Sequence, residues 1–362
     1  MPTNGDGEGR ERKIRDMLGL VKFCLESTAK EDASGNSSSN IEPMDPDRRA
    51  WLQEAINSMS IDTTRQLLEN LSLVKETVSQ LEKDHDHSIP VQKTCNAIEV
   101  LTDLCEEIDY AADFAKLDGF SIFRPLIDCS HEELIVKACE LIAALAQNNP
   151  ICQDIAMRTR LLERLIDFVA TKNGQTYIKA RSYALYAISS IIRSNQDVRT
   201  HFETQLDGLT VLLQLLDYHH YDQILDTTPS KATSKQEDNK STTVYWWRKL
   251  RIRSVFLFRT LCSESENASK FFYDKQAIKR IADQLEKSND PEIREHLLNA
   301  LKAFLLSLDP PKQIEAFKLS QNLAAIVQQL HKSSSQESGD EYDLTDTRST
   351  CQELLNLIDS LK

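Results

Sequence analysis

Glycine is scarce in this chain, at 9 of 362 residues, where an average protein would hold roughly 7%. Strand-rich folds with tight turns and phosphate-binding loops both depend on glycine, because its backbone adopts positive φ angles at little cost. The shortage argues against both and favours a helical fold. The sequence also contains no GxxxxGK, GxGxxG, GxSxG or HExxH pattern. We therefore assign no catalytic residue and expect no cofactor.

Positive charge is in deficit, since 43 Lys and Arg residues face 56 Asp and Glu residues, for a formal net charge of −13. Binding to nucleic acid requires a local excess of Lys and Arg that neutralises phosphates, so nucleic acid is not the expected partner. An apolar run of 18 residues is absent as well. The first residues, MPTNGDGEGRERK, are polar where a signal peptide would have an apolar core. We expect no membrane segment and a cytoplasmic location.

Paired metal and redox motifs are also missing. The eight cysteines include no CxxC pair, and most lie inside apolar helical stretches, which predicts buried, reduced thiols. Two histidine pairs, at 85 and 87 and at 219 and 220, fall in polar segments. Metal binding there is an alternative, but solvated loop histidines are the commoner reading of such pairs. We expect no metal site.

The two ends of the chain differ from its middle. Residues 1–44 are expected to form a mobile segment with one short amphipathic helix at 14–25. Residues 335–362 are expected to be a polar linker followed by a C-terminal helix that caps the array or packs back on it. Between them, 45–334 form the expected core. It opens with a pair of helices, the first starting at Asp45-Pro46-Asp47 and the second running from about 63 to 82.

From residue 95 a three-part unit repeats. Each unit has an apolar helix, a polar turn, a second apolar anchor ten to thirteen residues later and a third amphipathic stretch. The anchors of the first helices are 41, 46, 70 and 43 positions apart; they are Leu104, Leu145, Ile191, Leu261 and Phe304. A polar insertion at 218–243, predicted to be a mobile surface loop, accounts for the long interval. This period predicts an all-α, armadillo-like repeat solenoid of four to five repeats with flanking helical pairs.

Basic residues recur at one phase of the repeat, on what we expect to be the last helix of each unit, near the start of the third helix that lines the concave groove of armadillo arrays. They are Lys137, then Lys179 and Arg181, then Lys249, Arg251 and Arg253. A row of cations in a groove would fit an acidic protein surface. The alternative is that these side chains solvate helix ends or pair with nearby acids. Trp246 and Trp247 precede the last three, and either an interface anchor or ordinary core packing explains them.

Four segments of the chain resemble a known family. They are DRRAWLQEAINSM at 47–59, LTDLCEEIDYAADFAKLDGF at 101–120, YALYAISSIIR at 183–193 and KLRIRS at 249–254. They resemble the cytosolic armadillo-type nucleotide exchange factors of the 70-kDa heat-shock chaperone, the heat-shock-protein-70-binding protein family. The similarity extends from about residue 14 to about residue 330, and LCEEIDYAADF is its most specific part.

The resemblance implies a mechanism and a set of contacts. A curved helical core would embrace lobe II of the chaperone's ATPase domain and displace lobe I, so that ADP leaves and substrate release is aided. By motif match, Ala111 in the DxAA turn and the pair Arg251 and Arg253 would touch the chaperone. The segment GLVKFCLES resembles the family's mobile N-terminal element, which is associated with release of bound peptide. The resemblance thus implies a monomeric, cytosolic co-chaperone.

Two departures from the family pattern bear on the contacts of Lys179 and Arg181. The insertion at 218–243 is longer than the family leads us to expect, and Tyr183 stands where the family commonly has a basic residue. A generic armadillo scaffold or cargo adaptor is the alternative function. Import receptors of this fold carry a repeated Trp-Asn ladder, whereas tryptophan occurs here in only one repeat. The missing motifs disfavour a third reading, a hydrolase or transferase.

Overall fold

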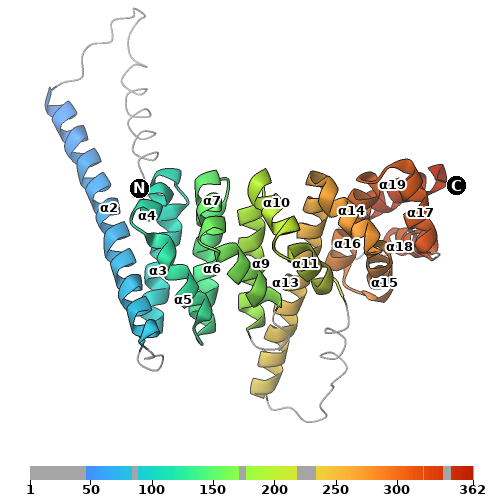
Figure 1. Cartoon of the computed structure of the whole chain (residues 1–362), viewed down its shortest axis with the longest axis horizontal. Helices are drawn as coiled ribbons and strands as arrows, with labels where there is room; N and C mark the ends of the chain where they lie inside the picture. Colours follow the sequence, from blue (N-terminus) through green and yellow to red (C-terminus); the bar gives the residue numbers. More distant parts are fainter. Residues whose placement is uncertain are drawn as a thin grey trace, which may run out of the picture. The chain divides into compact units, whose positions relative to one another are not determined.

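The computed structural model describes residues 46–83, 89–170, 177–217, 234–320, 322–336 and 344–361. Every regular element in these ranges is a helix (Figure 1). The chain divides into two compact units, residues 1–69 and 70–362. The amphipathic helix predicted at 14–25 lies outside the described residues, as do all four histidines of the two pairs. Within the described ranges no helix is both long and apolar enough to cross a membrane.

The first described helix, α2, runs without a break over Pro46–Glu82. The prediction of two helices here was wrong, because the segment between them contains neither glycine nor proline and nothing in it stops a helix from propagating. The boundary between the two compact units falls inside α2, at Glu69 and Asn70. The part that belongs to the second unit packs on the next helix, where the hydroxyls of Thr77 and Thr94 lie 2.9 Å apart in a hydrogen bond.

Three helices recur along the second unit. The first and longest helix of each triplet is α3 (Val91–Cys105), α6 (Glu132–Ala146), α9 (Ile178–Ile192), α13 (Ser234–Glu264) or α16 (Pro291–Leu306). The second is α4 (Ile108–Lys116), α7 (Pro150–Arg158), α10 (Gln196–Thr204), α14 (Glu266–Asp274) or α17 (Pro310–Leu319). The third is α5 (Phe123–Asp128), preceded by the 3-10 turn η2 (Gly119–Ile122), then α8 (Leu161–Ala170), α11 (Gly208–Leu215), α15 (Ala277–Lys287) or α18 (Leu323–Gln336).

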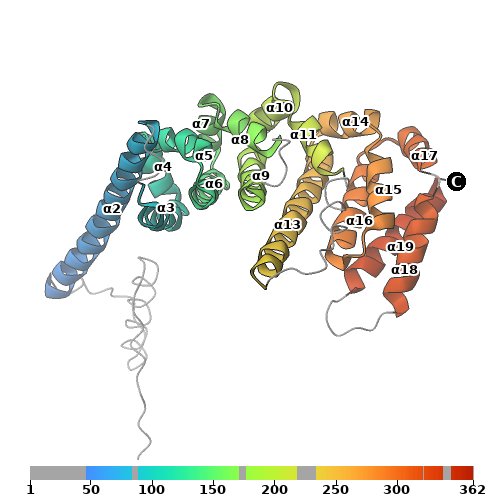
Figure 2. The same cartoon turned by 90° about the horizontal axis from the view of Figure 1, so that it is seen from below.

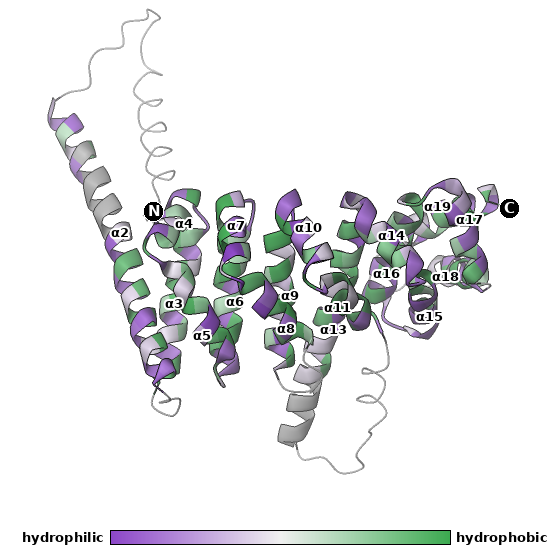
Figure 3. Ribbon diagram, in the orientation of Figure 1, coloured by the Kyte–Doolittle hydropathy of each residue, from purple (hydrophilic) through white to green (hydrophobic). Residues whose placement is uncertain are grey.

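The long helices stand side by side in one row, each packed on the next, and the second helices form another row (Figure 2). A C-terminal helix is present, as predicted: α19 (Thr345–Ser360) packs on α16 and α18. Figure 3 shows apolar residues along α6 and α9, which have neighbours on both sides. Most side chains of these two helices are buried. Such helices need apolar residues over most of their surface rather than along one stripe.

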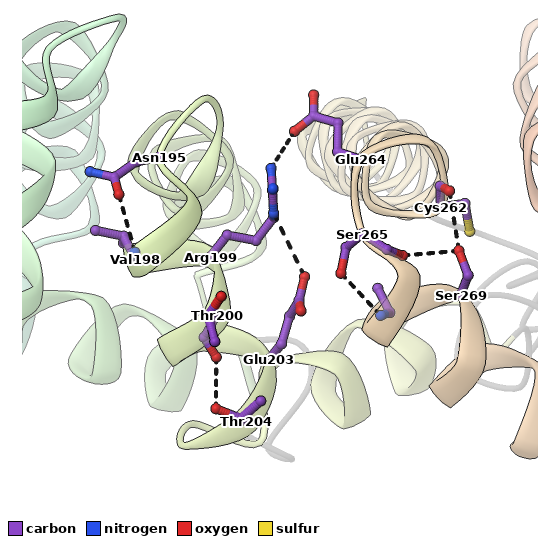
Figure 4. Close-up of polar contacts among 11 residues, drawn as sticks. Asn195, Val198, Arg199, Thr200, Glu203, Thr204, Cys262, Glu264, Ser265 and Ser269 are labelled. Atoms are coloured by element: carbon purple, nitrogen blue, oxygen red, sulfur yellow. Dashed lines mark hydrogen bonds and ion pairs between the residues drawn. The ribbon is translucent and has the colours of Figure 1, made fainter. Parts of the chain in front are cut away.

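A side-chain cap starts the second helix in four of the five triplets. The capping oxygens of Asn149, Asn195, Ser265 and Asp309 each accept a hydrogen bond from the backbone N–H three residues later, which satisfies a donor that the helix itself leaves unpaired. Four residues after the cap, Gln153, Ser269 and Gln313 donate to carbonyls at the end of the preceding long helix. At the same position in α10, Arg199 instead pairs with Glu264 at the end of α13, 2.7 Å away (Figure 4).

The turn into the third helix brings the chain under an aromatic ring in two triplets. A Cβ on Gly119 would lie 2.4 Å from Phe114, and one on Gly208 would lie 2.3 Å from Phe202. Glycine is therefore required at these two positions by close approach, not by backbone conformation. In three triplets this turn contains a left-handed residue other than glycine, namely Asp118, Arg160 or Gln276, with φ between 54° and 59°. This shows how a helical array manages with little glycine.

The insertion predicted as a loop over 218–243 is helical from Ser234 onward, because α13 starts there. That part of the prediction was wrong. The residues from 234 to 243 contain no proline or glycine, so a helix fixed by its packed C-terminal half extends backward through them. Residues 218–233 lie outside the described chain.

Candidate functional site

The predicted cations lie on three neighbouring long helices, α6, α9 and α13, but they do not form a row of free charges. Aromatic rings accompany them where α9 packs on α13. The Tyr183 and Trp246 rings have centroids 5.5 Å apart, and the Lys179 ammonium nitrogen lies 5.4 Å from the centre of the Trp246 indole. We call the surface formed by Lys179, Tyr183, Tyr186, Trp246 and Arg253 the α9–α13 strip.

Arg253 lies at the centre of this strip. Its guanidinium carbon is 4.8 Å from the Tyr183 ring centroid and 5.2 Å from that of Tyr186, within the range of a cation–π contact. Its Nη1 also donates to the Ser182 hydroxyl at 3.0 Å. Burial lowers the pKa of Arg253, while the neighbouring tyrosines act in the opposite direction. Arginine nevertheless stays charged at physiological pH, so the structure holds a partly desolvated cation here.

The two adjacent tryptophans have different roles, which sequence alone did not resolve. Trp247 is 9% exposed and belongs to the core, where the Arg181 guanidinium lies 5.6 Å from its ring. Trp246 is half-buried in the strip, and Tyr245, 47% exposed, packs against it edge-on with ring centroids 5.0 Å apart.

Two of the predicted contact residues, Arg181 and Arg251, are buried. Nε and Nη2 of Arg181 donate to the Val169 carbonyl at 3.2 and 2.8 Å, and burial lowers its pKa. Nε and Nη2 of Arg251 donate to Oε1 of Gln284 at 3.1 and 2.8 Å. Both guanidinium groups thus tie a long helix to the third helix of a triplet. In this arrangement they stabilise the fold and present little surface to a partner.

The remaining two cations, Lys249 and Lys137, have acidic neighbours. Lys249 lies 3.9 Å from Glu292 and 5.7 Å from the Tyr245 ring centroid. Lys137 lies 2.9 Å from Glu140 and 3.8 Å from Glu99. Burial acts to lower the pKa of Lys137, but its hydrogen bond to Glu140 and the two carboxylate charges outweigh this and raise it. The alternative reading, pairing with nearby acids, therefore describes these two lysines.

Lys137 lines a cleft of about 730 Å³ along α3, α6 and α9. The cleft has acidic walls, and Tyr183 and Tyr186 close the end that faces the strip; its charged residues are Glu99, Asp103, Glu106, Lys137 and Glu140. Burial, and next to it the charge of Glu140, raise the pKa of Tyr183. Tyr183 thus joins an acidic surface on α3 and α6 to a cationic surface on α9 and α13.

Ala111 lies away from these residues, in the row of second helices. Its side chain is 1% exposed. Ala111 lies four residues after Glu107, which is the N-cap residue of α4. Other triplets place a hydrogen-bonding side chain at this position, whereas Ala111 contributes only a methyl group. In this structure Ala111 is a buried residue of α4, and a direct contact with a partner at Ala111 remains a prediction.

The aromatic partners of the cations were missed at the sequence level. Tyr183 and Tyr186 are three residues apart on α9, and Trp246 and Arg253 are seven apart on α13. Such spacings place residues on one helical face. A helical projection of α9 and α13 would have shown the tyrosines on the face of the basic residues. The register between the two helices, which brings these faces together, is a tertiary property.

Comparison of the sequence with known proteins finds one family domain in the middle of the chain. Residues 110–226 match the family described as the SIL1/FES1/HPBP1 C-terminal domain. Hsp70-binding protein 1 from Mus musculus is 26% identical over 212 residues, which cover 58% of this chain and 57% of the mouse protein. The Homo sapiens protein is 26% identical over 209 residues, which cover 57% and 56%. The match thus spans a little over half the length of these relatives.

Solved structures with a similar fold are armadillo-like. One engineered protein superposes with a TM-score of 0.54 at 16% identity, covering 80% of this chain and 97% of its own. A designed armadillo repeat protein gives a TM-score of 0.52 at 15% identity, covering 78% and 98%. At such identities the likeness concerns the fold alone. It confirms the prediction of an all-α, armadillo-like solenoid.

Proposed function

We propose that the protein is a co-chaperone that binds the ATPase domain of an Hsp70 chaperone and promotes release of ADP, a proposal supported by the match of residues 110–226 to the SIL1/FES1/HPBP1 C-terminal domain. The observation that carries the proposal is the match to this domain together with the similarity to Hsp70-binding protein 1. The proposal needs no catalytic residue, because it concerns a protein that binds and changes no covalent bond.

The docking surface in this proposal is the row of long helices, centred on the α9–α13 strip. Aromatic residues and arginine are the side chains that most often dominate binding energy at protein interfaces, and the strip combines Trp246, two tyrosines and Arg253 in one place. The acidic cleft beside it gives this face both signs of charge. Such a surface would fix the orientation of its partner more than it would add affinity.

Exchange would follow from preferential binding to one state of the chaperone. A surface that fits the open ATPase domain better than the closed one shifts the population toward open, by no more than the difference between its two affinities. The finer steps, binding to lobe II and displacement of lobe I, are part of this proposal. So is the assignment of Ala111, Lys137, Lys179, Arg181, Lys249, Arg251 and Arg253 as partner-binding residues, with the qualification that Arg181 and Arg251 act through the fold.

A cytoplasmic, monomeric protein is also part of the proposal. The cytoplasmic location rests on cysteine usage, since none of the seven cysteines in the described residues forms a disulfide. Such usage suits a reducing compartment. Sedimentation of the purified protein and imaging of a tagged chain in cells would test these two points.

Release of a fluorescent ADP analogue from a cytosolic 70-kDa chaperone tests the proposal. The rate is measured with and without this protein, at concentrations above that of the chaperone. The proposal predicts a release rate that rises with this protein and then saturates. A complex that forms without faster release would instead support the alternative function, an armadillo scaffold or adaptor.

A further inference from the structure

Arg253 differs from the other strongly held cations of this surface in the kind of group that holds it. Arg248 contacts two carboxylates, Asp290 and Glu292, and Lys137 contacts Glu99 and Glu140. Among the residues that the structure describes, no carboxylate forms an ion pair with Arg253; its neighbours are the rings of Tyr183 and Tyr186 and the hydroxyls of Tyr183 and Ser182.

This arrangement is unusual for a chain with an excess of 13 negative charges. A partly buried guanidinium loses hydration, and a carboxylate within hydrogen-bond reach would compensate for most of that loss. Cation–π contacts compensate for only part of it, because the quadrupole of a neutral ring attracts a cation less strongly than a full negative charge does. Arg253 is therefore fixed in place yet lacks the counter-charge that its chemistry favours.

We infer that Tyr183 and Tyr186 are positioning residues that hold the Arg253 guanidinium ready to bind a carboxylate on the partner's surface. The inference rests on the proposed function and adds two residues and a partner chemistry to it. Both tyrosines lie on α9, three residues apart, and Arg253 reaches them from α13. The position of Arg253 between the two tyrosine rings thus depends on the packing of α9 against α13.

The guanidinium suits this task better than an ammonium group. It is planar, it packs flat on aromatic rings, and its remaining N–H groups can bind a carboxylate through two parallel hydrogen bonds. Because the rings already restrict its rotamers, less side-chain entropy is lost when the carboxylate binds. Lys at this position would keep the charge but lose both the stacking and the paired hydrogen bonds.

The rings and the hydroxyl groups of the tyrosines have separable roles. The cation–π contact needs only the ring, so phenylalanine at position 186 should still position Arg253. The hydroxyl of Tyr183 contacts Arg253 as well as Glu140, so a change at Tyr183 would alter more than the ring contact. We therefore place the cleanest test at Tyr186, which contacts Arg253 through its ring.

A double-mutant cycle tests the inference, using the full chain and the isolated ATPase domain of a cytosolic 70-kDa chaperone. Affinity is measured by calorimetry for the natural protein, Tyr186→Leu, Arg253→Ala and the double variant. We expect Tyr186→Leu to weaken binding roughly tenfold and to have no further effect when Arg253 is already Ala. Tyr186→Phe should recover most of the loss, and Arg253→Lys should behave like Arg253→Ala.

A matched control comes from helix α14, where Lys275 lies 5.8 Å from the Phe271 ring centroid in the other row of helices. Phe271→Leu removes a contact of the same kind and should leave affinity unchanged. Circular dichroism of each variant establishes that it is folded.

Two results would overturn the inference while leaving the proposed function intact. One is unchanged affinity in a folded Tyr186→Leu variant. The other is the same loss from Tyr186→Leu in both backgrounds, which would mean that the ring binds the partner by itself. If the natural protein fails to bind the ATPase domain at all, the proposed function fails, and the inference fails with it.

Discussion

The guanidinium of Arg253 lies 4.8 Å from the ring centroid of Tyr183, and this contact joins α13 to α9. Arg251, two residues earlier on the same helix, points instead into the core and bonds to Gln284. One basic motif in the sequence therefore supplies a surface contact and a structural contact. The direction in which each side chain leaves the helix decides which arginine makes the surface contact and which makes the core contact.

Arg181 and Arg251 should affect stability more than binding. In Arg181→Met the buried Val169 carbonyl loses its donors, and we expect the free energy of unfolding to fall by about 1–3 kcal/mol. Urea unfolding followed by circular dichroism measures this. Lys116→Ala, which removes a lysine whose side chain is 74% exposed, is the control and should change stability by less than about 0.5 kcal/mol. A partner affinity that drops in a fully folded Arg181→Met protein would show a direct contact instead.

Gly119→Ala should destabilise the fold through overpacking. The added methyl would lie 2.4 Å from Phe114, a ring that is fully buried against Phe120 and Phe123. We expect a loss of about 1–3 kcal/mol in unfolding free energy. The double variant Gly119→Ala/Phe114→Leu makes room for the methyl, so its loss should be smaller than the sum of the two single losses. Simple additivity in thermal or urea unfolding would contradict the steric explanation.

Asp290 should make stability depend on pH. Its side chain caps α16 by accepting from the Ile293 N–H at 3.1 Å, and it pairs with Arg248. Burial opposes ionisation, but these hydrogen bonds prevail and lower the pKa of Asp290. A lowered pKa means that the ionised form adds stability above the unfolded pKa, near 4, and that this is lost as pH falls through the folded pKa.

We expect Asp290→Ala to lower the free energy of unfolding at pH 7 by about 0.5–2 kcal/mol, mainly through the lost cap. Asp290→Asn keeps a capping oxygen but not the charge, so it should lose less. Unfolding in urea from pH 7 down to pH 3 measures both. The gap between the natural protein and Asp290→Asn should close toward low pH, and a gap that stays constant would rule out the ionised carboxylate as its source.

Buried cysteines should resist alkylation in the folded protein. Burial raises the pKa of Cys105 to about 12 and that of Cys152 to about 11, so at pH 8 only about one Cys105 thiol in ten thousand is the reactive thiolate. Cys129 is half-buried and should react first among these three. Mass spectrometry after brief iodoacetamide treatment, with and without urea, checks the order. Rapid labelling of Cys105 in native protein would contradict the packing of α3.

The helical array could be predicted from the sequence because its signals are local and repeated. Four of the five predicted anchors, Leu145, Ile191, Leu261 and Phe304, are at most 1% exposed, whereas Leu104 is half-buried. Helix α2 is present from Pro46 onward, where the sequence predicted a helix. Local patterns failed where they had to decide whether a helix stops, in the middle of α2 and at the start of α13.

The site was less predictable for a physical reason. A basic residue on a helix can turn toward a carbonyl, an aromatic ring, an acid or solvent, and only tertiary packing selects among these. Arg181 donates to the Val169 carbonyl, Arg253 contacts two tyrosine rings, and Lys137 pairs with two carboxylates. Their common phase in the repeat was visible in the sequence, whereas their partners on neighbouring helices were not.

The most direct test of the account measures reciprocal linkage between ADP and this protein on the chaperone's ATPase domain. The affinity of the protein for that domain is determined without nucleotide and with saturating ADP, and the affinity of ADP is determined with and without the protein. Because the two couplings are thermodynamically the same quantity, the account predicts that each ligand weakens the other by the same factor. Two affinities that are each unaffected by the other ligand would contradict exchange as the function.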